Sequence, residues 1–171
     1  MDIFKWIAIY KEINQMIAYL SGAMENAQGE GADWRNGITV WLMDNLNHSV
    51  IDPVIETAKL VKKQKSQNYR SWKTADPNKF REFVRLAVDN DLNSVVNKSD
   101  YLICLWNNDV ISGGGTHGEV TMAYYYNKPI YLINQLKDME LSGWIMACAT
   151  EIFTDFDSMQ KRLLDIYGKK V

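Results

Sequence analysis

The 171-residue chain is poor in the residues that build metal centres and disulfide frameworks. It has two cysteines, Cys104 and Cys148, both in apolar surroundings, and two histidines, His48 and His117. Two isolated cysteines indicate buried thiols in a reducing compartment and not a disulfide-stapled domain. No spacing of Cys and His residues matches a metal site. We therefore expect no metal ion and no cofactor.

Long hydrophobic runs and an excess of positive charge are also missing. The longest strongly apolar runs, such as residues 101–106, are far too short to cross a bilayer. The N-terminal residues lack the pattern of a signal peptide. The formal net charge of −2 argues against an electrostatic grip on nucleic acid. We expect a cytoplasmic protein with neither a membrane nor a nucleic-acid polymer as partner.

What the chain does contain is a regular alternation of short apolar runs and helical patterns. With 47% hydrophobic residues it can form a real core. The alternation predicts an α/β fold, a flavodoxin-like three-layer sandwich whose mostly parallel sheet has about five strands. Residues 1–171 are expected to form a single domain, with an N-terminal helical extension over 1–15. The expected strands are 16–20, 49–53, 101–106, 130–133 and 151–153; the expected helices are 34–45, 77–98, 116–127 and 155–167.

Three helix starts have predicted side-chain caps. Asp33 precedes the first of these helices, Asp76 stands before Pro77, and Thr116 opens the helix after the central strand. The lysine-rich segment 54–73 is expected to form a solvated helix and loop, with a phosphate or partner surface as the alternative.

The sequence "GGGTHGE", residues 113–119, is the strongest local signal. It places three glycines between the central strand and a helix whose first turn contains Glu119. Such a turn points backbone N–H groups at a ligand and lets it approach closely. A simple tight turn with a dipole-favoured Glu is the alternative interpretation. A Walker phosphate loop is excluded because no Gly-Lys-Ser/Thr follows, and the G-x-G-x-x-G pattern at Gly113, Gly115 and Gly118 lacks a ribose-binding acid after the next strand.

Three stretches in order, "AYLSGAM", "NDLNSVVNKSDYLICLW" and "GTHGEVTMAYYYNKPIYLI", resemble the nucleoside 2-deoxyribosyltransferase family, which includes hydrolases of nucleoside 5′-monophosphates. The resemblance spans most of residues 16–133. It implies cleavage of the N-glycosidic bond of a deoxynucleoside or deoxynucleotide, with transfer of the sugar to another base or to water.

The resemblance also implies roles for particular residues. Glu119 corresponds to the nucleophile, Asp91 in "NDLN" to the residue that contacts the base and transfers protons, and Tyr19 to the tyrosine that holds the nucleophile. Asp89 is a neighbouring acid that can replace Asp91. The other candidate substrate contacts lie in the loops after the first and central strands, where ligands of parallel sheets bind: Gly22, Met24, Asp109, Ser112, Gly113, Gly115, Thr116 and His117.

Two departures from the family pattern accompany the resemblance. Gly113 stands where the family commonly has a sugar-binding acid, and Asp109 is the possible substitute. One extra residue separates Asp91 from Asp100. Arg35, at a helix start near the first loop, is a possible phosphate ligand.

Two alternatives to the main interpretation stay open. The "SGGGTHGE" turn is also similar to that of phosphoribohydrolases that activate cytokinin nucleotides. A non-catalytic nucleotide sensor is the third possibility, which Gly113 favours. The family resemblance further implies a homodimer or higher homo-oligomer, in which the apolar segment 141–148 closes the neighbouring subunit's site.

Overall fold

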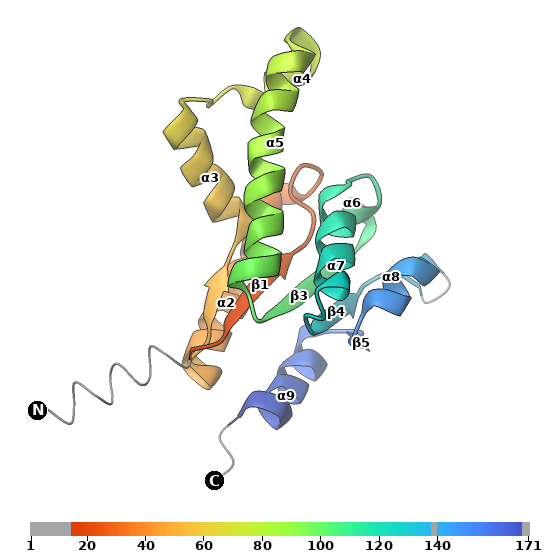
Figure 1. Ribbon diagram of the computed structural model, residues 1–171. Helices are drawn as coiled ribbons and strands as arrows, with labels where there is room; N and C mark the ends of the chain where they lie inside the picture. The colour runs from red at the N-terminus through yellow and green to blue at the C-terminus, as the bar shows by residue number, and fades with distance from the viewer. Residues whose placement is uncertain (1–14, 138–139, 169–171) are drawn as a thin grey trace, which may run out of the picture.

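A five-stranded, all-parallel sheet forms the centre of the protein (Figure 1). The computed structural model describes residues 15–137 and 140–168. The strand order is β2-β1-β3-β4-β5, the flavodoxin-like order. The predicted fold class is therefore confirmed. The strands are β1 (Ile17–Ser21), β2 (Ser49–Ile51), β3 (Tyr101–Trp106), β4 (Ile130–Asn134) and β5 (Glu151–Phe153).

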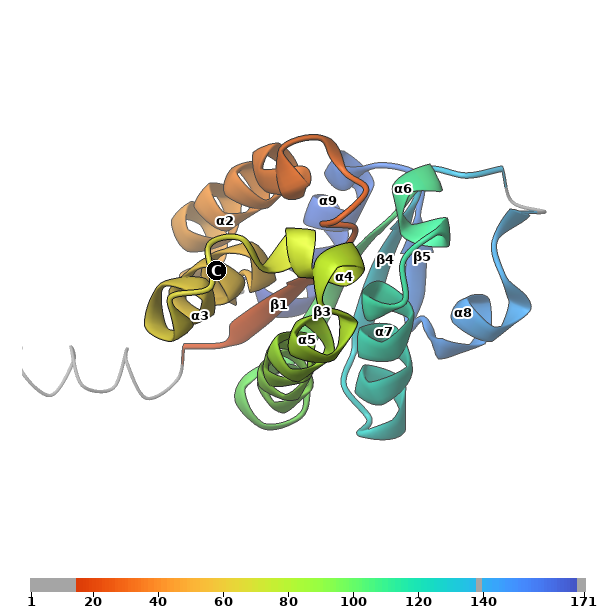
Figure 2. The same ribbon diagram turned by 90° about the horizontal axis from the view of Figure 1, so that it is seen from above.

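Burial on both faces explains why the sequences of the central strands are continuous apolar runs. Every residue of β3 and of β4 is buried, because helices cover the sheet from two sides. In Figure 2, α2 (Ala32–Leu46) and α9 (Phe156–Tyr167) lie over one face. On the other face, α5 (Pro77–Asn93) and α7 (Gly115–Tyr125) lie side by side, flanked by α3 (Pro53–Gln64) and α8 (Gly143–Cys148). The three predicted layers are thus present.

The helix starts confirm one predicted cap and correct two. Asp76 accepts a hydrogen bond from the Lys79 N–H at 3.1 Å, as expected. Asp33 does not cap α2, because the chain enters this helix through Gly31 in the left-handed conformation. Thr116 does not cap α7 either; the helix already begins at Gly115, which places Thr116 inside the first turn.

Several short elements were not predicted. They are η1 (Gln28–Gly31), η2 (Tyr69–Ser71), α4 (Trp72–Ala75), η3 (Ser94–Lys98), α6 (Asn108–Ile111) and α8. The expected loop 107–115 therefore contains one helical turn, and the helix expected over 77–98 ends as a π-helical turn. These pieces are too short for apolar periodicity to reveal them.

The segment 141–148 packs on its own subunit. Leu141, Ile145 and Cys148 are buried in the core beneath α7 and α8, while Trp144 and Met146 are exposed. The predicted N-terminal helix over 1–15 falls almost wholly outside the described residues. Within the described part of the chain, none of the helices has the length and apolar character needed to span a membrane.

Candidate active site

The candidate site lies where the strand order reverses, between β1 and β3. In doubly wound sheets ligands bind at this point, beyond the carboxyl ends of the strands. The loop after β1, residues 22–31, and the loop after β3, residues 107–114, both start there. A cavity of about 350 Å³ opens between these loops and α5, within the size range of small-molecule sites.

Most of the predicted site residues line this cavity. They are Gly22, Met24, Asp91, Asp109, Gly113, Gly115, Thr116 and Glu119. These residues come from β1's loop, α5, α6 and α7, which are far apart in sequence. The fold brings them together because β1 and β3 end at the same edge of the sheet and α5 packs beside α7.

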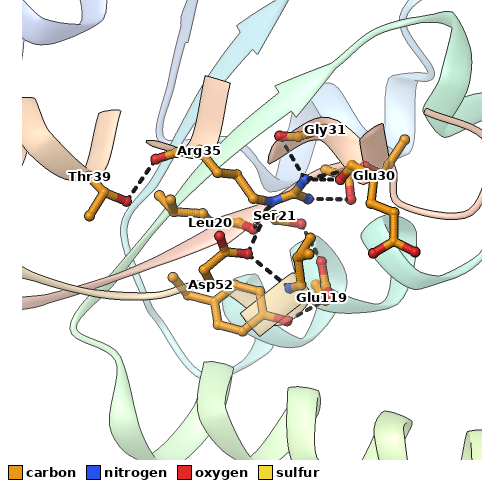
Figure 3. A network of polar contacts seen from close by, with 12 residues as sticks. Leu20, Ser21, Glu30, Gly31, Arg35, Thr39, Asp52 and Glu119 are labelled. Carbon is orange, nitrogen blue, oxygen red and sulfur yellow. Dashed lines mark hydrogen bonds and ion pairs between the residues drawn. The ribbon is translucent and has the colours of Figure 1, made fainter. Parts of the chain in front are cut away.

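Glu119 is an acidic side chain at this edge whose carboxylate oxygens both accept hydrogen bonds. It sits one turn into α7 and is buried, with 7% of its surface exposed. The Tyr19 hydroxyl donates to its Oε1 at 2.8 Å and the Ser21 hydroxyl donates to its Oε2 at 2.5 Å. Tyr19 and Ser21 are two residues apart on β1 and therefore point to the same face of the sheet. Figure 3 shows Glu119 beneath the end of this strand.

These contacts have opposite effects on the ionisation of Glu119. Burial raises the pKa of Glu119 above the usual value for a glutamate, while the hydrogen bonds from Ser21 and Tyr19 and the charge of Arg35 lower it. Hydrogen-bond donors and a nearby cation favour the carboxylate form. Burial also raises the pKa of Tyr19, and the Glu119 charge adds to this effect. Tyr19 therefore stays protonated and donates to Glu119.

Asp91, at the C-terminal end of α5, is the second carboxyl group facing the cavity. Its desolvation, reinforced by the charge of Glu119, raises the pKa of Asp91 to about 7. Asp91 can therefore be protonated near neutral pH. At Glu119 the two hydroxyl donors and Arg35 favour the carboxylate form and oppose the effect of burial. An acid and a nucleophile acting on one bond need carboxyl groups whose environments differ in this way. Asp89, the predicted substitute, is exposed and does not line the cavity.

One face of α5 forms an apolar wall that runs away from Asp91. Its residues recur at helical spacing and line the cavity for three turns: Phe80, Phe83, Val84, Ala87 and Val88. Tyr69 lies 4.5 Å from Phe83, measured between ring centroids, and extends the wall. Such a wall suits the flat, apolar faces of an aromatic heterocycle.

Two cations, Arg70 and Lys73, lie at the outer end of the cavity. Both are already paired with the first loop: Arg70 with Glu30, and Lys73 with Glu25 at 2.7 Å. The four side chains are 41–57% exposed, so each pair is weak and screened by salt. The lysine-rich segment 54–73 thus contributes to the cavity, which the sequence offered only as an alternative.

The glycines of the "GGG" turn leave space for a ligand. Their φ angles are negative, so the left-handed conformation is not the reason for glycine here. A Cβ at Gly114 or Gly115 meets no atom within 4 Å, and one at Gly113 makes only ordinary contacts. Side chains at these positions would instead occupy the open cavity.

Three sequence-based assignments are corrected by the structure. Ser112 is exposed at the end of α6 and does not line the cavity. His117 packs edge-on against Trp106, 4.7 Å between ring centroids, on another side of α7. Arg35 is fully buried and donates to backbone carbonyl groups, so it is not available as a phosphate ligand.

The sequence interpretation missed Ser21. It named Arg70 and Lys73 only within the lysine-rich segment, for which a phosphate or partner surface was the alternative. Ser21 was detectable, because it follows Tyr19 by two residues at the end of a predicted strand and must share its face. The two cations had no comparable signal, since their position depends on how η2 and α4 fold back over the first loop.

Comparison with known proteins finds no match for this chain, either among protein-family models or among curated sequences. In the described residues, no cluster of three or more His, Cys, Asp or Glu side chains is arranged to hold a metal ion. The geometry of the cavity is therefore the basis for the functional argument.

Proposed function

We propose that the protein cleaves the N-glycosidic bond of a 2′-deoxynucleoside and transfers the deoxyribosyl group to another base or to water. The observation that supports this most strongly is the pair of unlike carboxyl groups in one cavity. Glu119 is held by two hydroxyl donors, and Asp91 has a pKa raised to about 7. The resemblance to nucleoside 2-deoxyribosyltransferases assigns the same two residues.

In the first half-reaction a carboxylate oxygen of Glu119 attacks C1′ of the sugar. The bond from C1′ to the base nitrogen breaks, its electron pair stays on the base, and Asp91 donates a proton to the leaving base. The product is a glycosyl ester of Glu119. In the second half-reaction a new base, or water, attacks C1′ and gives its proton to the Asp91 carboxylate. The ester bond between C1′ and Glu119 breaks, and its electron pair returns to the Glu119 carboxylate.

The charges around the cavity support a neutral nucleoside over its monophosphate. The acids that line the cavity besides the proton donor Asp91, namely Glu25, Asp109 and Glu119, outnumber the cations Arg70 and Lys73. Both cations are already paired with carboxylates of the first loop. A phosphate group must break these pairs or approach the acids, and both cost free energy. Asp109 lies in the turn where the family pattern has its sugar-binding acid, and we propose that it contacts a sugar hydroxyl.

Transfer to a base is preferred over hydrolysis, because the apolar wall of α5 offers an acceptor base the same surface that the leaving base uses.

No cofactor or metal takes part in this reaction scheme. We expect the enzyme to act in the cytoplasm on free nucleosides and bases.

The test is a product assay with deoxynucleosides, ribonucleosides and their 5′-monophosphates, each with and without adenine as acceptor. Free base and newly formed nucleoside are separated by chromatography. We expect release from 2′-deoxynucleosides and formation of deoxyadenosine when adenine is present. Glu119→Gln should reduce both to background while keeping the fold, since the Gln carbonyl oxygen can accept from one of the Tyr19 and Ser21 hydroxyl groups and its NH2 group can donate to the other.

The other outcomes identify the alternatives. Release only from ribonucleoside monophosphates indicates a phosphoribohydrolase, and binding without release from any compound indicates a sensor. Full activity of Glu119→Gln contradicts the proposed mechanism.

A further inference from the structure

Arg35 is a buried cation behind the candidate site. Its side chain on α2 has no exposed surface, and its guanidinium group reaches across the end of β1 (Figure 3). It donates to five backbone carbonyl groups, those of Leu20 at 3.4 Å, Gly22 at 2.9 Å, Ala23 at 3.4 Å, Glu30 at 2.7 Å and Gly31 at 3.2 Å.

These bonds hold both ends of the first loop, residues 22–31, to one point. The loop provides one wall of the cavity through Gly22, Met24 and its neighbours. It is so close to Arg35 that a Cβ at Gly31 lies 2.6 Å from Nη1, and Gly31 also has φ +70°. The loop is therefore shaped around the guanidinium group, and its shape depends on a five-donor side chain.

Stability alone is a weak reason for placing a charge here. Asp52 is the carboxylate partner, 3.6 Å from Nε, and the same Asp52 oxygen accepts a hydrogen bond from the Val54 N–H to cap α3. Burial lowers the pKa of Arg35, which the charge of Asp52 partly offsets. A buried ion pair of this kind is often no more stable than apolar side chains of similar volume.

The guanidinium group of Arg35 lies next to the residue that holds the nucleophile. It donates to the carbonyl groups of Leu20 and Gly22, and Ser21 between them donates to Glu119. The titratable groups around Glu119 are Tyr19 from β1, Cys104 from β3 and Asp91 from α5. These side chains carry no positive charge in either protonation state. Arg35 is the cation that lowers the pKa of Glu119. Without it, burial of Glu119 would be opposed only by its two hydroxyl donors.

We propose that Arg35 is a positioning residue, which holds a fixed positive charge behind Glu119 and clamps the first loop into the shape of the cavity wall. Its contribution to catalysis rests on the function proposed above. Its effect on Glu119 and on the loop belongs to the ligand-free protein.

The test is the titration of the Glu119 carboxyl group in the full-length, ligand-free protein. Glutamate side chains are labelled with 13C, and the Glu119 signal is assigned by its absence in Glu119→Gln. Arg35→Met should raise the pKa of Glu119, because the cation is gone. Asp52→Asn should lower it, because the negative charge that offsets Arg35 is gone while Asn still caps α3.

Arg35→Lys separates the two parts of the role. Lysine keeps the charge but cannot make the same five hydrogen bonds. We expect the Glu119 titration to stay near that of the wild type, whereas KM for the nucleoside rises because the loop is no longer clamped.

A folded Arg35→Met protein with an unchanged Glu119 titration overturns the proposal. If Arg35→Met does not fold, Asp52→Asn decides alone: an unchanged or raised pKa of Glu119 overturns the proposal, and a lowered one supports it. A raised Glu119 pKa in Arg35→Met and a lowered one in Asp52→Asn support the role of Arg35 even if the protein cleaves no nucleoside. Lack of cleavage then contradicts only the proposed function.

Discussion

At the scale of single residues, the fold treats two neighbouring carboxyl groups differently. Glu119 receives hydroxyl donors and the field of a buried cation, and Asp91 receives neither. Both carboxyl groups are desolvated, but Asp91 also lies near the charge of Glu119, and together these conditions keep a carboxylic acid protonated near pH 7. The difference in environment, and not in residue type, separates the proposed acid from the proposed nucleophile.

This arrangement predicts a stability cost at Asp91. An unfolded aspartate titrates near 3.9, whereas the pKa of folded Asp91 is about 7. Wild-type stability therefore falls as pH rises from about 4 to 7, since only the unfolded chain readily releases the proton. Asp91→Asn should match the wild type below about pH 4 and exceed it by on the order of 2–4 kcal/mol above pH 7. Urea unfolding at a series of pH values measures this difference.

Asp89→Asn is the matched control, because Asp89 lies two residues away and is exposed. It should leave the pH dependence of stability unchanged. Equal effects of the two substitutions, or no gain from Asp91→Asn at pH 8, contradict the raised pKa.

The family resemblance named Glu119, Asp91 and Tyr19 from local motifs. The structure places Glu119 and Asp91 at one cavity, with Tyr19 hydrogen-bonded to Glu119. The sequence could not exclude Ser112, because α6 is too short for apolar periodicity to reveal it, or His117, because that requires the phase of α7. The inward face of this helix presents Thr116, Glu119, Val120 and Ala123. His117, about 200° around the helix from Glu119, points elsewhere.

At the scale of elements, the buried strands follow from the sequence pattern, whereas the loops that line the cavity do not. The central strands β3 and β4 are predicted well from the sequence, because burial on both faces produces a continuous apolar run. The start of α2 could not be predicted in this way. Gly31 adopts φ +70° and its carbonyl group accepts a hydrogen bond from Arg35, and helix propensities carry no information about such a tertiary contact. The cavity wall depends on such tertiary contacts.

The glycine turn gives a prediction that separates folding from binding. Gly115→Ala adds a methyl group that meets no protein atom and extends into the cavity. Stability should be unchanged or up to about 1 kcal/mol higher, since Ala favours a helix. KM for the nucleoside should rise by about fivefold or more, since a methyl group that crowds a ligand costs about 1–3 kcal/mol.

Gly118→Ala is the control within the same helix. Its Cβ also meets nothing within 4 Å, but Gly118 does not line the cavity. It should stabilise the protein by about 0.5–1 kcal/mol and leave KM unchanged. If both substitutions affect KM equally, the turn does not form part of the substrate site.

At the scale of the whole molecule, the outer surface of α7 and α8 has exposed aromatic side chains. Trp144 is 67% exposed and Tyr125 is 74% exposed, with Tyr124 and Tyr126 beside them. Large exposed aromatic residues are frequent at subunit interfaces. We expect a homodimer or larger homo-oligomer that buries this surface. Analytical ultracentrifugation at micromolar concentration should show it, and Trp144→Ala should weaken it; a monomer for the wild type contradicts the expectation.

The whole arrangement serves one proposed event, the formation of a bond between Glu119 and a sugar. The direct measurement is mass spectrometry of the protein, quenched in acid within milliseconds of mixing with a 2′-deoxynucleoside and no acceptor. We predict that the intact protein gains the mass of one deoxyribosyl group, and that peptide mapping places it on Glu119. An unmodified Glu119 while base is released, or an adduct on another residue, contradicts the account.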